Sequence, residues 1–160
     1  MGLADVSNIL WRQRHLLDLL EFKLEEQQLL LAAGRTRWVG RATSEVERVL
    51  EELRSTELMR SVAVEEVALD LALRPGPSLR ELIFAAPEPW ADILTQHRDA
   101  FLTLTRSVSQ LAHENQELLG RVEQATRDLL GSLGEPVTTV YTAEGVVATR
   151  SSHLVVDEVL

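Results

Sequence analysis

Four histidines and the carboxylates near them are the side chains with which this chain could hold a metal ion or move a proton. His113 and Glu117 stand four residues apart and would share one face of a helix, which is half of a metal site. A second pair at that spacing does not accompany them, so we expect a surface pair. His97 falls on an apolar seam, where we expect a core or boundary histidine with a satisfied hydrogen bond.

Motifs for nucleophilic or phosphate chemistry are missing from the sequence. It contains no nucleophile-elbow motif and no glycine-rich phosphate loop. Cysteine is absent, which excludes disulfide bonds and thiolate metal sites. The sequence therefore predicts no catalytic residue, no metal site and no cofactor, and a protein that is not an enzyme.

The charge and hydropathy of the chain limit its partners. Its 160 residues carry a formal net charge of -9, which argues against nucleic acid because phosphate backbones attract basic surfaces. No signal peptide or membrane span is recognisable, since apolar runs such as 29–33 are far too short. We expect a cytoplasmic protein without membrane insertion.

A long helix is the element that would position a binding surface. One stripe follows steps of three and four residues, and it consists of Leu94, His97, Phe101, Leu104, Val108, Leu111, Asn115, Leu118, Val122, Ala125 and Leu129. The stripe predicts a helix over 90–131, about 63 Å long at 1.5 Å per residue. A compact globule of this size has a radius of gyration of only about 15 Å. We therefore expect a rod that binds other helices.

Two further helices precede the long one. The first is expected to begin near Asp5 or Ser7 and to end at Ala33, followed by Gly34 in the left-handed conformation. Its apolar face is broad enough to contact two neighbours.

The second helix is expected to begin after Thr36, or at 43–44 if Gly40 delays it. The acid-rich side of 45–70 is interpreted as a solvated outer face. The apolar stripe slips phase around 55–56 and consists of Val39, Ala42, Val46, Leu50, Leu53, Leu58, Val62, Leu69 and Leu73.

Proline-rich breaks divide the remainder of the chain. After 74–77, Ser78 and Glu81 form a capping box for a short helix over 79–86, and 87–89 ends it. Short loops make neighbouring helices antiparallel. The predicted fold is all-α: an elongated antiparallel three-helix bundle or coiled coil with one short accessory helix, spanning 1–133. A flexible tail over 134–160 is expected to follow, with a small β-hairpin as the alternative.

Unequal helix lengths give the physical argument for a partner. The first helix cannot cover the full length of the other two, so part of the apolar seam stays open. Asn115, the polar residue in the middle of the seam, either fixes register as a buried residue or marks where the seam is open. Tyr141 in the tail is either an aromatic docking anchor or a residue that packs casually against the bundle.

Several segments together resemble FlgN-like flagellar proteins of actinobacteria. The resemblance covers about residues 1 to 131, and its segments are 1–12, 19–27, 33–38, 85–90 and 97–101. It implies a cytoplasmic export chaperone of the flagellar type III secretion system. Such a chaperone holds hook-associated (hook–filament junction) proteins and delivers them to the export apparatus. No site residue is carried over, because the family is defined by architecture and binding.

The expected function is therefore helix-in-groove binding of the terminal amphipathic helix of a hook-associated protein. The expected partner-binding residues lie in the second half of the long helix and in the tail, and they are Leu111, Asn115, Leu118, Leu119, Val122, Leu129 and Tyr141. The alternative is a homodimeric coiled-coil adaptor without chaperone activity, in which Asn115 pairs with its copy across the two-fold axis.

Overall fold

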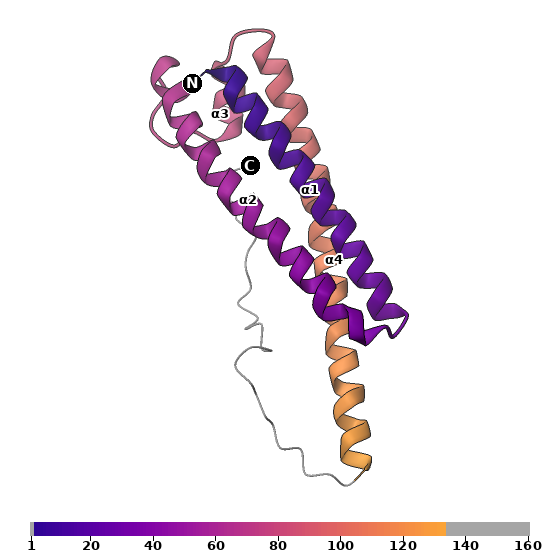
Figure 1. The fold of residues 1–160 in the computed structure, drawn as a ribbon. Helices are drawn as coiled ribbons and strands as arrows, with labels where there is room; N and C mark the ends of the chain where they lie inside the picture. The colour runs from indigo at the N-terminus through magenta and orange to yellow at the C-terminus, as the bar shows by residue number, and fades with distance from the viewer. Residues whose placement is uncertain (1, 134–160) are drawn as a thin grey trace.

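A computed structural model describes residues 2–133, which form a rod-shaped bundle (Figure 1). Its helices are α1 (Leu3–Ala32), α2 (Thr36–Asp70), α3 (Leu79–Ala85) and α4 (Trp90–Ser132). The prediction of three long helices with one short accessory helix is confirmed. The expected tail or hairpin over 134–160 lies outside the described residues. Within residues 2–133, no helix combines the length and the apolar character that crossing a bilayer requires.

The central helix of the bundle is α1, which contacts both α2 and α4. Gln13 bonds to Glu57 and Gln27 bonds to Thr43, so α1 and α2 run antiparallel. The pairs that join α1 to α4 keep a nearly constant separation of 86 to 91 residues along the chain, so these two helices run parallel. The broad apolar face predicted for the first helix therefore contacts two neighbours, as expected.

The end of α1 is set by Gly34, whose φ of +65° lies in the left-handed region. The N–H of Arg35 donates to the carbonyl of Leu30 at 2.9 Å, and the N–H of Gly34 donates to that of Leu31 at 3.1 Å. These two bonds form the Schellman motif, which satisfies carbonyls that the helix leaves free. The left-handed glycine predicted at this position is confirmed.

The start of α1 differs from the prediction. The helix begins at Leu3 with Gly2 as its N-cap, before the expected start at Asp5 or Ser7. The carboxylate of Asp5 accepts the N–H of Gly2 at 2.9 Å. Asp5 therefore lies in the first turn, where its negative charge also favours the positive end of the helix dipole.

The accessory helix α3 has the predicted capping box. The Ser78 hydroxyl accepts the N–H of Glu81 at 3.3 Å, and the Glu81 carboxylate accepts the N–H of Ser78 at 2.8 Å. Arg74 adds an ion pair at 2.7 Å. The hydrogen bond from the Ser78 backbone, followed by that from Arg74, lowers the pKa of Glu81 to about 2. The box defines the start of α3, whose buried Leu79 and Leu82 belong to an apolar cluster with residues of α2 and α4.

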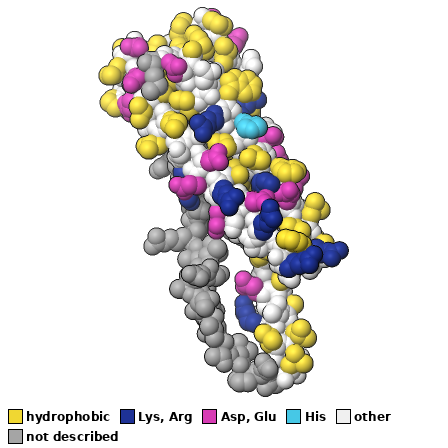
Figure 2. Space-filling model, viewed as in Figure 1, with side chains coloured by type: hydrophobic (Ala, Val, Ile, Leu, Met, Phe, Trp, Pro, Cys, Tyr) yellow, Lys and Arg dark blue, Asp and Glu magenta, His cyan; other side chains and the backbone are white. Residues whose placement is uncertain are grey.

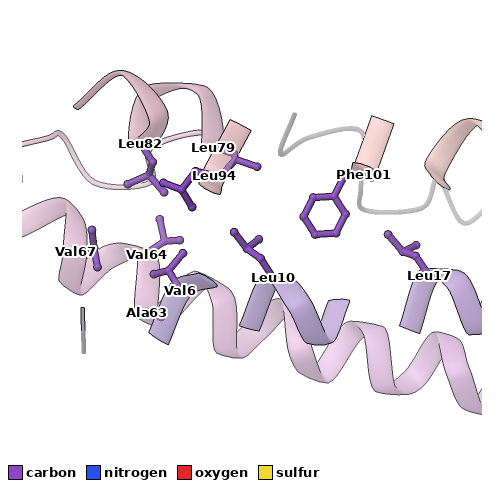
Figure 3. Packing of buried hydrophobic residues seen from close by; sticks show 10 residues of the cluster. All are labelled: Val6, Leu10, Leu17, Ala63, Val64, Val67, Leu79, Leu82, Leu94 and Phe101. Carbon is purple, nitrogen blue, oxygen red and sulfur yellow. The ribbon is translucent and has the colours of Figure 1, made fainter. Parts of the chain in front are cut away.

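Apolar packing is concentrated in two clusters along the rod. The first joins all four helices and is shown in Figure 3; it contains Val6, Leu10, Leu17, Ala63, Val64, Val67, Leu79, Leu82, Leu94 and Phe101. The second joins α1, α2 and α4 nearer the α1–α2 turn and contains Leu16, Leu20, Leu24, Val46, Val49 and Val108. Both clusters depend on α1, which contributes to each of them.

The second half of α2 packs with a face that the sequence did not predict. Leu58, Val62 and Leu69 belong to the predicted apolar stripe, but they are 69%, 49% and 78% exposed. The buried positions are Thr56, Arg60, Ala63, Val64, Val67 and Ala68. Ala63, Val64 and Val67 of this buried face pack in the first apolar cluster, whereas the larger side chains of the predicted stripe face outward.

Candidate functional site

Asn115 joins α4 to α1 by buried hydrogen bonds. Its side chain is 2% exposed, and its Nδ2 donates to the carbonyl of Leu24 at 2.9 Å and to Gln27 Oε1 at 3.0 Å. The Nε2 of Gln27 in turn donates to the hydroxyl of Thr43 on α2 at 2.9 Å. One polar rung therefore crosses all three long helices. Asn115 was predicted either to be buried and fix register or to mark an opening of the seam. In the structure it is buried, and its hydrogen bonds fix the register of the helices.

His97 lies near the other end of the α1–α4 interface. It is 1% exposed, and its Nε2 lies 3.2 Å from the hydroxyl of Ser7. The ring of Trp11 meets it edge-on at 5.1 Å, and the guanidinium of Arg14 lies over that tryptophan at 4.3 Å. Burial, followed by the charge of Arg14, lowers the pKa of His97 to about 4. His97 is therefore a neutral histidine at pH 7, and its predicted place in the core is confirmed. The predicted hydrogen bond is made by Nε2 alone, since the buried Nδ1 has no partner among the described residues.

His113 and Glu117 form the predicted surface pair. Their side chains are 69% and 55% exposed, and His113 Nε2 lies 3.6 Å from Glu117 Oε1. Arg121 approaches the other oxygen of Glu117 at 3.8 Å. In the described part of the chain, no group of three or more His, Cys, Asp or Glu residues could hold a metal ion.

The last turns of α4 extend beyond the rest of the bundle (Figure 1). The constant separation between α1 and α4 puts the end of α1, at Ala32, level with residues 118–123 of α4. Every residue from 123 to 133 is exposed. About twelve residues of α4, or roughly 18 Å at 1.5 Å per residue, therefore have no neighbouring helix.

One side of this extension is apolar, and we call it the projecting face. It consists of Leu118, Leu119, Val122, Leu129, Leu130 and Leu133. The first three are partly buried where α1 ends, while Leu129, Leu130 and Leu133 are 62%, 40% and 68% exposed. Hydrophobic side chains at this end of the molecule are visible in Figure 2.

The opposite side of the extension is polar and is paired within the helix. Arg127 pairs with Glu123 at 3.4 Å, and the amide of Gln124 donates to Asp128 at 2.8 Å. These groups have partners within α4. The extension is therefore amphipathic, with a polar side bonded within the helix and an open apolar side.

The structure separates the predicted partner-binding residues into two groups. Leu118, Leu119, Val122 and Leu129 lie together on the projecting face. Leu111 packs against the second apolar cluster and Asn115 is buried, so a partner would reach either of them only by displacing α1. Tyr141 lies outside the described residues.

Leu130 and Leu133 belong to the projecting face but were not predicted. The strict seam ended at Leu129, and a two-residue-per-heptad pattern omits flanking positions. Helical geometry could have identified them, because Leu130 and Leu133 follow Thr126 and Leu129 at steps of four residues.

The sequence matches one known protein family over most of its length. A family model described as FlgN protein matches residues 1–149. No curated protein and no solved structure matches significantly.

Proposed function

The chain belongs to the FlgN family of flagellar export chaperones, which bind hook-associated proteins, and from this premise we propose that its projecting face holds its client. The proposed client segment is the terminal amphipathic helix of a hook-associated protein. The observation that carries the proposal is an apolar helix face, level with the end of α1, that no described helix covers.

The proposed contact continues the packing of the bundle. Along most of its length α4 packs against α1, which runs parallel to it and ends at Ala32. A client helix would occupy the equivalent place along the last turns of α4, with its apolar residues against Val122, Leu129 and Leu133. This is the helix-in-groove mode, in which anchors at steps of three and four residues supply most of the affinity.

Such binding would act as chaperoning without any chemical step. A terminal helix covered by α4 could not pair with other subunits, so premature assembly and aggregation of the client would be prevented. We place this activity in the cytoplasm, before export, and propose that 1–133 is the chaperone domain. Delivery to the export apparatus would use the tail over 134–160, with Tyr141 as its aromatic docking residue.

The proposal is tested with the doubly substituted variant L129D/L133D. Both side chains are well exposed, so the bundle should fold as before. We expect calorimetric affinity for the client's terminal helix to fall at least thirtyfold, and the pair L118D/V122D to act in the same direction. Phe84→Asp, at a 94% exposed position on α3, is the matched control and should bind normally.

Normal client affinity in L129D/L133D, with wild-type helicity by circular dichroism, would refute the site. For the tail, Tyr141→Ala should leave client affinity unchanged and reduce client export in cells. Normal export in that strain would remove the docking role of Tyr141.

A homodimer remains the second candidate, because the same open face could pair with its copy. Asn115 is not available for pairing across a two-fold axis, since its Nδ2 already bonds to Leu24 and Gln27. Light scattering separates the two candidates. A monomer that forms a one-to-one complex with client supports the chaperone, whereas a tight dimer that resists salt and is abolished by L129D/L133D supports the adaptor.

A further inference from the structure

The second half of α2 places large apolar side chains on its outer side. Thr56, Arg60 and Ala63 are buried, whereas Leu58 and Val62, on the opposite side of the same turns, are 69% and 49% exposed. A helix that used only one face would have the reverse arrangement. The outer face therefore carries large apolar side chains that the packing of the bundle does not use.

Four residues form this outer surface, which we call the outer α2 stripe: Leu58, Met59, Val62 and Leu69. Leu58, Val62 and Leu69 stand at positions i, i+4 and i+11, so they follow one line along the helix. The line is about 16 Å long, or three turns. Glu65 occupies the i+7 position of the same line, so the line offers apolar contacts and one carboxylate to another helix lying along α2.

The exposed charges along the stripe are mostly acidic. Between residues 55 and 70 they are Glu65, Glu66 and Asp70. Arg54, one turn before Leu58, is an exposed cation that pairs with Glu51 at 3.2 Å. The cation of this segment, Arg60, is buried, and its Nε donates to Glu57 at 2.9 Å. Figure 2 shows acidic groups among hydrophobic ones at this end of the molecule. The surface therefore combines large apolar side chains with a net acidic charge, and Glu65 lies between Val62 and Leu69.

We propose that the outer α2 stripe docks a basic amphipathic helix of another protein, distinct from the client. The net acidic charge of this surface supplies the argument, because complementary charge steers a partner and selects its sign. A second copy of this chain would set acidic groups against each other, and an anionic membrane surface would be repelled. The chain's own last apolar segment, 154–160, carries Asp157 and Glu158 and has no cation to offer.

The stripe and the projecting face lie at opposite ends of the rod. Gln13 bonds to Glu57, and the same part of α1 lies level with residue 101 of α4, whereas the projecting face begins at Leu118. The separation is on the order of 30 Å along the axis. A client and the basic helix could therefore be bound at the same time.

The test uses a labelled synthetic helix with four leucines spaced as in the stripe and flanked by lysines. A matched peptide carries glutamate in place of each lysine. With the full chain, we expect fluorescence anisotropy to show binding of the lysine peptide and none of the glutamate peptide. L58Q/L69Q should weaken that binding at least tenfold and E65Q/D70N several-fold, while raised salt should weaken it further.

Two controls separate this surface from the client site. L129Q/L133Q should bind the lysine peptide as the wild type does, and L58Q/L69Q should keep full client affinity. Both Leu58 and Leu69 are well exposed, so circular dichroism should show unchanged helicity and melting.

Four results would each overturn the proposal. The first is that L58Q/L69Q and the wild type bind the lysine peptide with equal affinity. The second is that the wild type binds the glutamate peptide as tightly as the lysine peptide. The third is a wild-type dimer by light scattering that L58Q/L69Q makes monomeric, which would identify a second copy as the occupant. The fourth is tighter peptide binding after removal of 154–160, which would identify the chain's own segment.

Discussion

Replacing Asn115 tests how the bundle fixes its register. In Asn115→Ala, two buried hydrogen bonds are lost and Gln27 Oε1 is left inside the bundle without its donor. A neutral hydrogen bond contributes about 1 kcal/mol, and a stranded buried acceptor costs about 1–3 kcal/mol. The Leu24 carbonyl can keep its helical bond, so it adds little. We expect the free energy of unfolding to fall by about 3 kcal/mol.

The double variant N115L/Q27L should recover most of that loss. It removes both polar partners, and it also removes Asn115 Oδ1, a buried acceptor that has no partner among the described residues. Thr43 keeps its bond to the Val39 carbonyl at 2.9 Å. Replacing both partners by apolar groups of similar size is nearly neutral, so we expect a coupling free energy of about 2–3 kcal/mol between the two sites.

Urea unfolding followed by circular dichroism measures these differences. The comparison requires that the unfolding free energy depend on urea concentration with the same slope in all variants. A loss of about 3 kcal/mol corresponds to a melting temperature lower by roughly 10 °C for a domain of this size. If N115L/Q27L is as unstable as the sum of its single variants, then the rung does not act as a unit and the reasoning is wrong. Asn115→Ala with wild-type stability would refute it as well.

Three further predictions concern the helix ends, the buried histidine and the projecting face. Ala72 has a φ of 53°, where an L-residue is strained by about 1–2 kcal/mol. Ala72→Gly should therefore stabilise the bundle by about 0.5–1 kcal/mol in urea unfolding. Gly34→Ala should destabilise it, because Gly34 also has a positive φ. The folded pKa of His97, about 4, lies below its unfolded value of 6.5; its contribution to stability is therefore complete above pH 6.5 and lost as the pH falls toward 4. Unfolding at pH 5 should thus cost about 2 kcal/mol less than at pH 7, and His97→Gln should remove that difference. L129D/L133D should change the free energy of unfolding by no more than about 0.5 kcal/mol, because neither side chain is packed in the bundle.

Local signals in the sequence predicted the helix ends well. Gly34 and the pair Ser78–Glu81 act within a few residues of themselves, so their neighbours along the chain were sufficient to place them. The start of α1 was misplaced because Asp5 can serve either as an N-cap or as the third residue of the first turn. Both uses satisfy the same orphan N–H groups, and only the path of the chain before Leu3 distinguishes them.

The face of α2 could not be predicted from periodicity. Leu58 and Val62 lie on one side of this segment, and Ala63 and Val67 lie on the other, so two apolar stripes compete. A hydrophobic pattern favours the stripe with the larger side chains, yet the structure buries the smaller stripe in the first apolar cluster. Which of the two is buried depends on how the other helices pack against α2, and this packing is a property of the whole bundle.

The open part of the seam follows from where α1 ends, and not from any special composition of α4. Leu118 and Val122 continue the same spacing as Leu94 and Phe101, which are buried. The difference arises because Gly34 turns the chain back at a level that α4 passes by about twelve residues. Comparing helix lengths could therefore show from the sequence that part of α4 is open. Locating the opening also required the register between α1 and α4, which the hydrogen bonds of Asn115 hold in place.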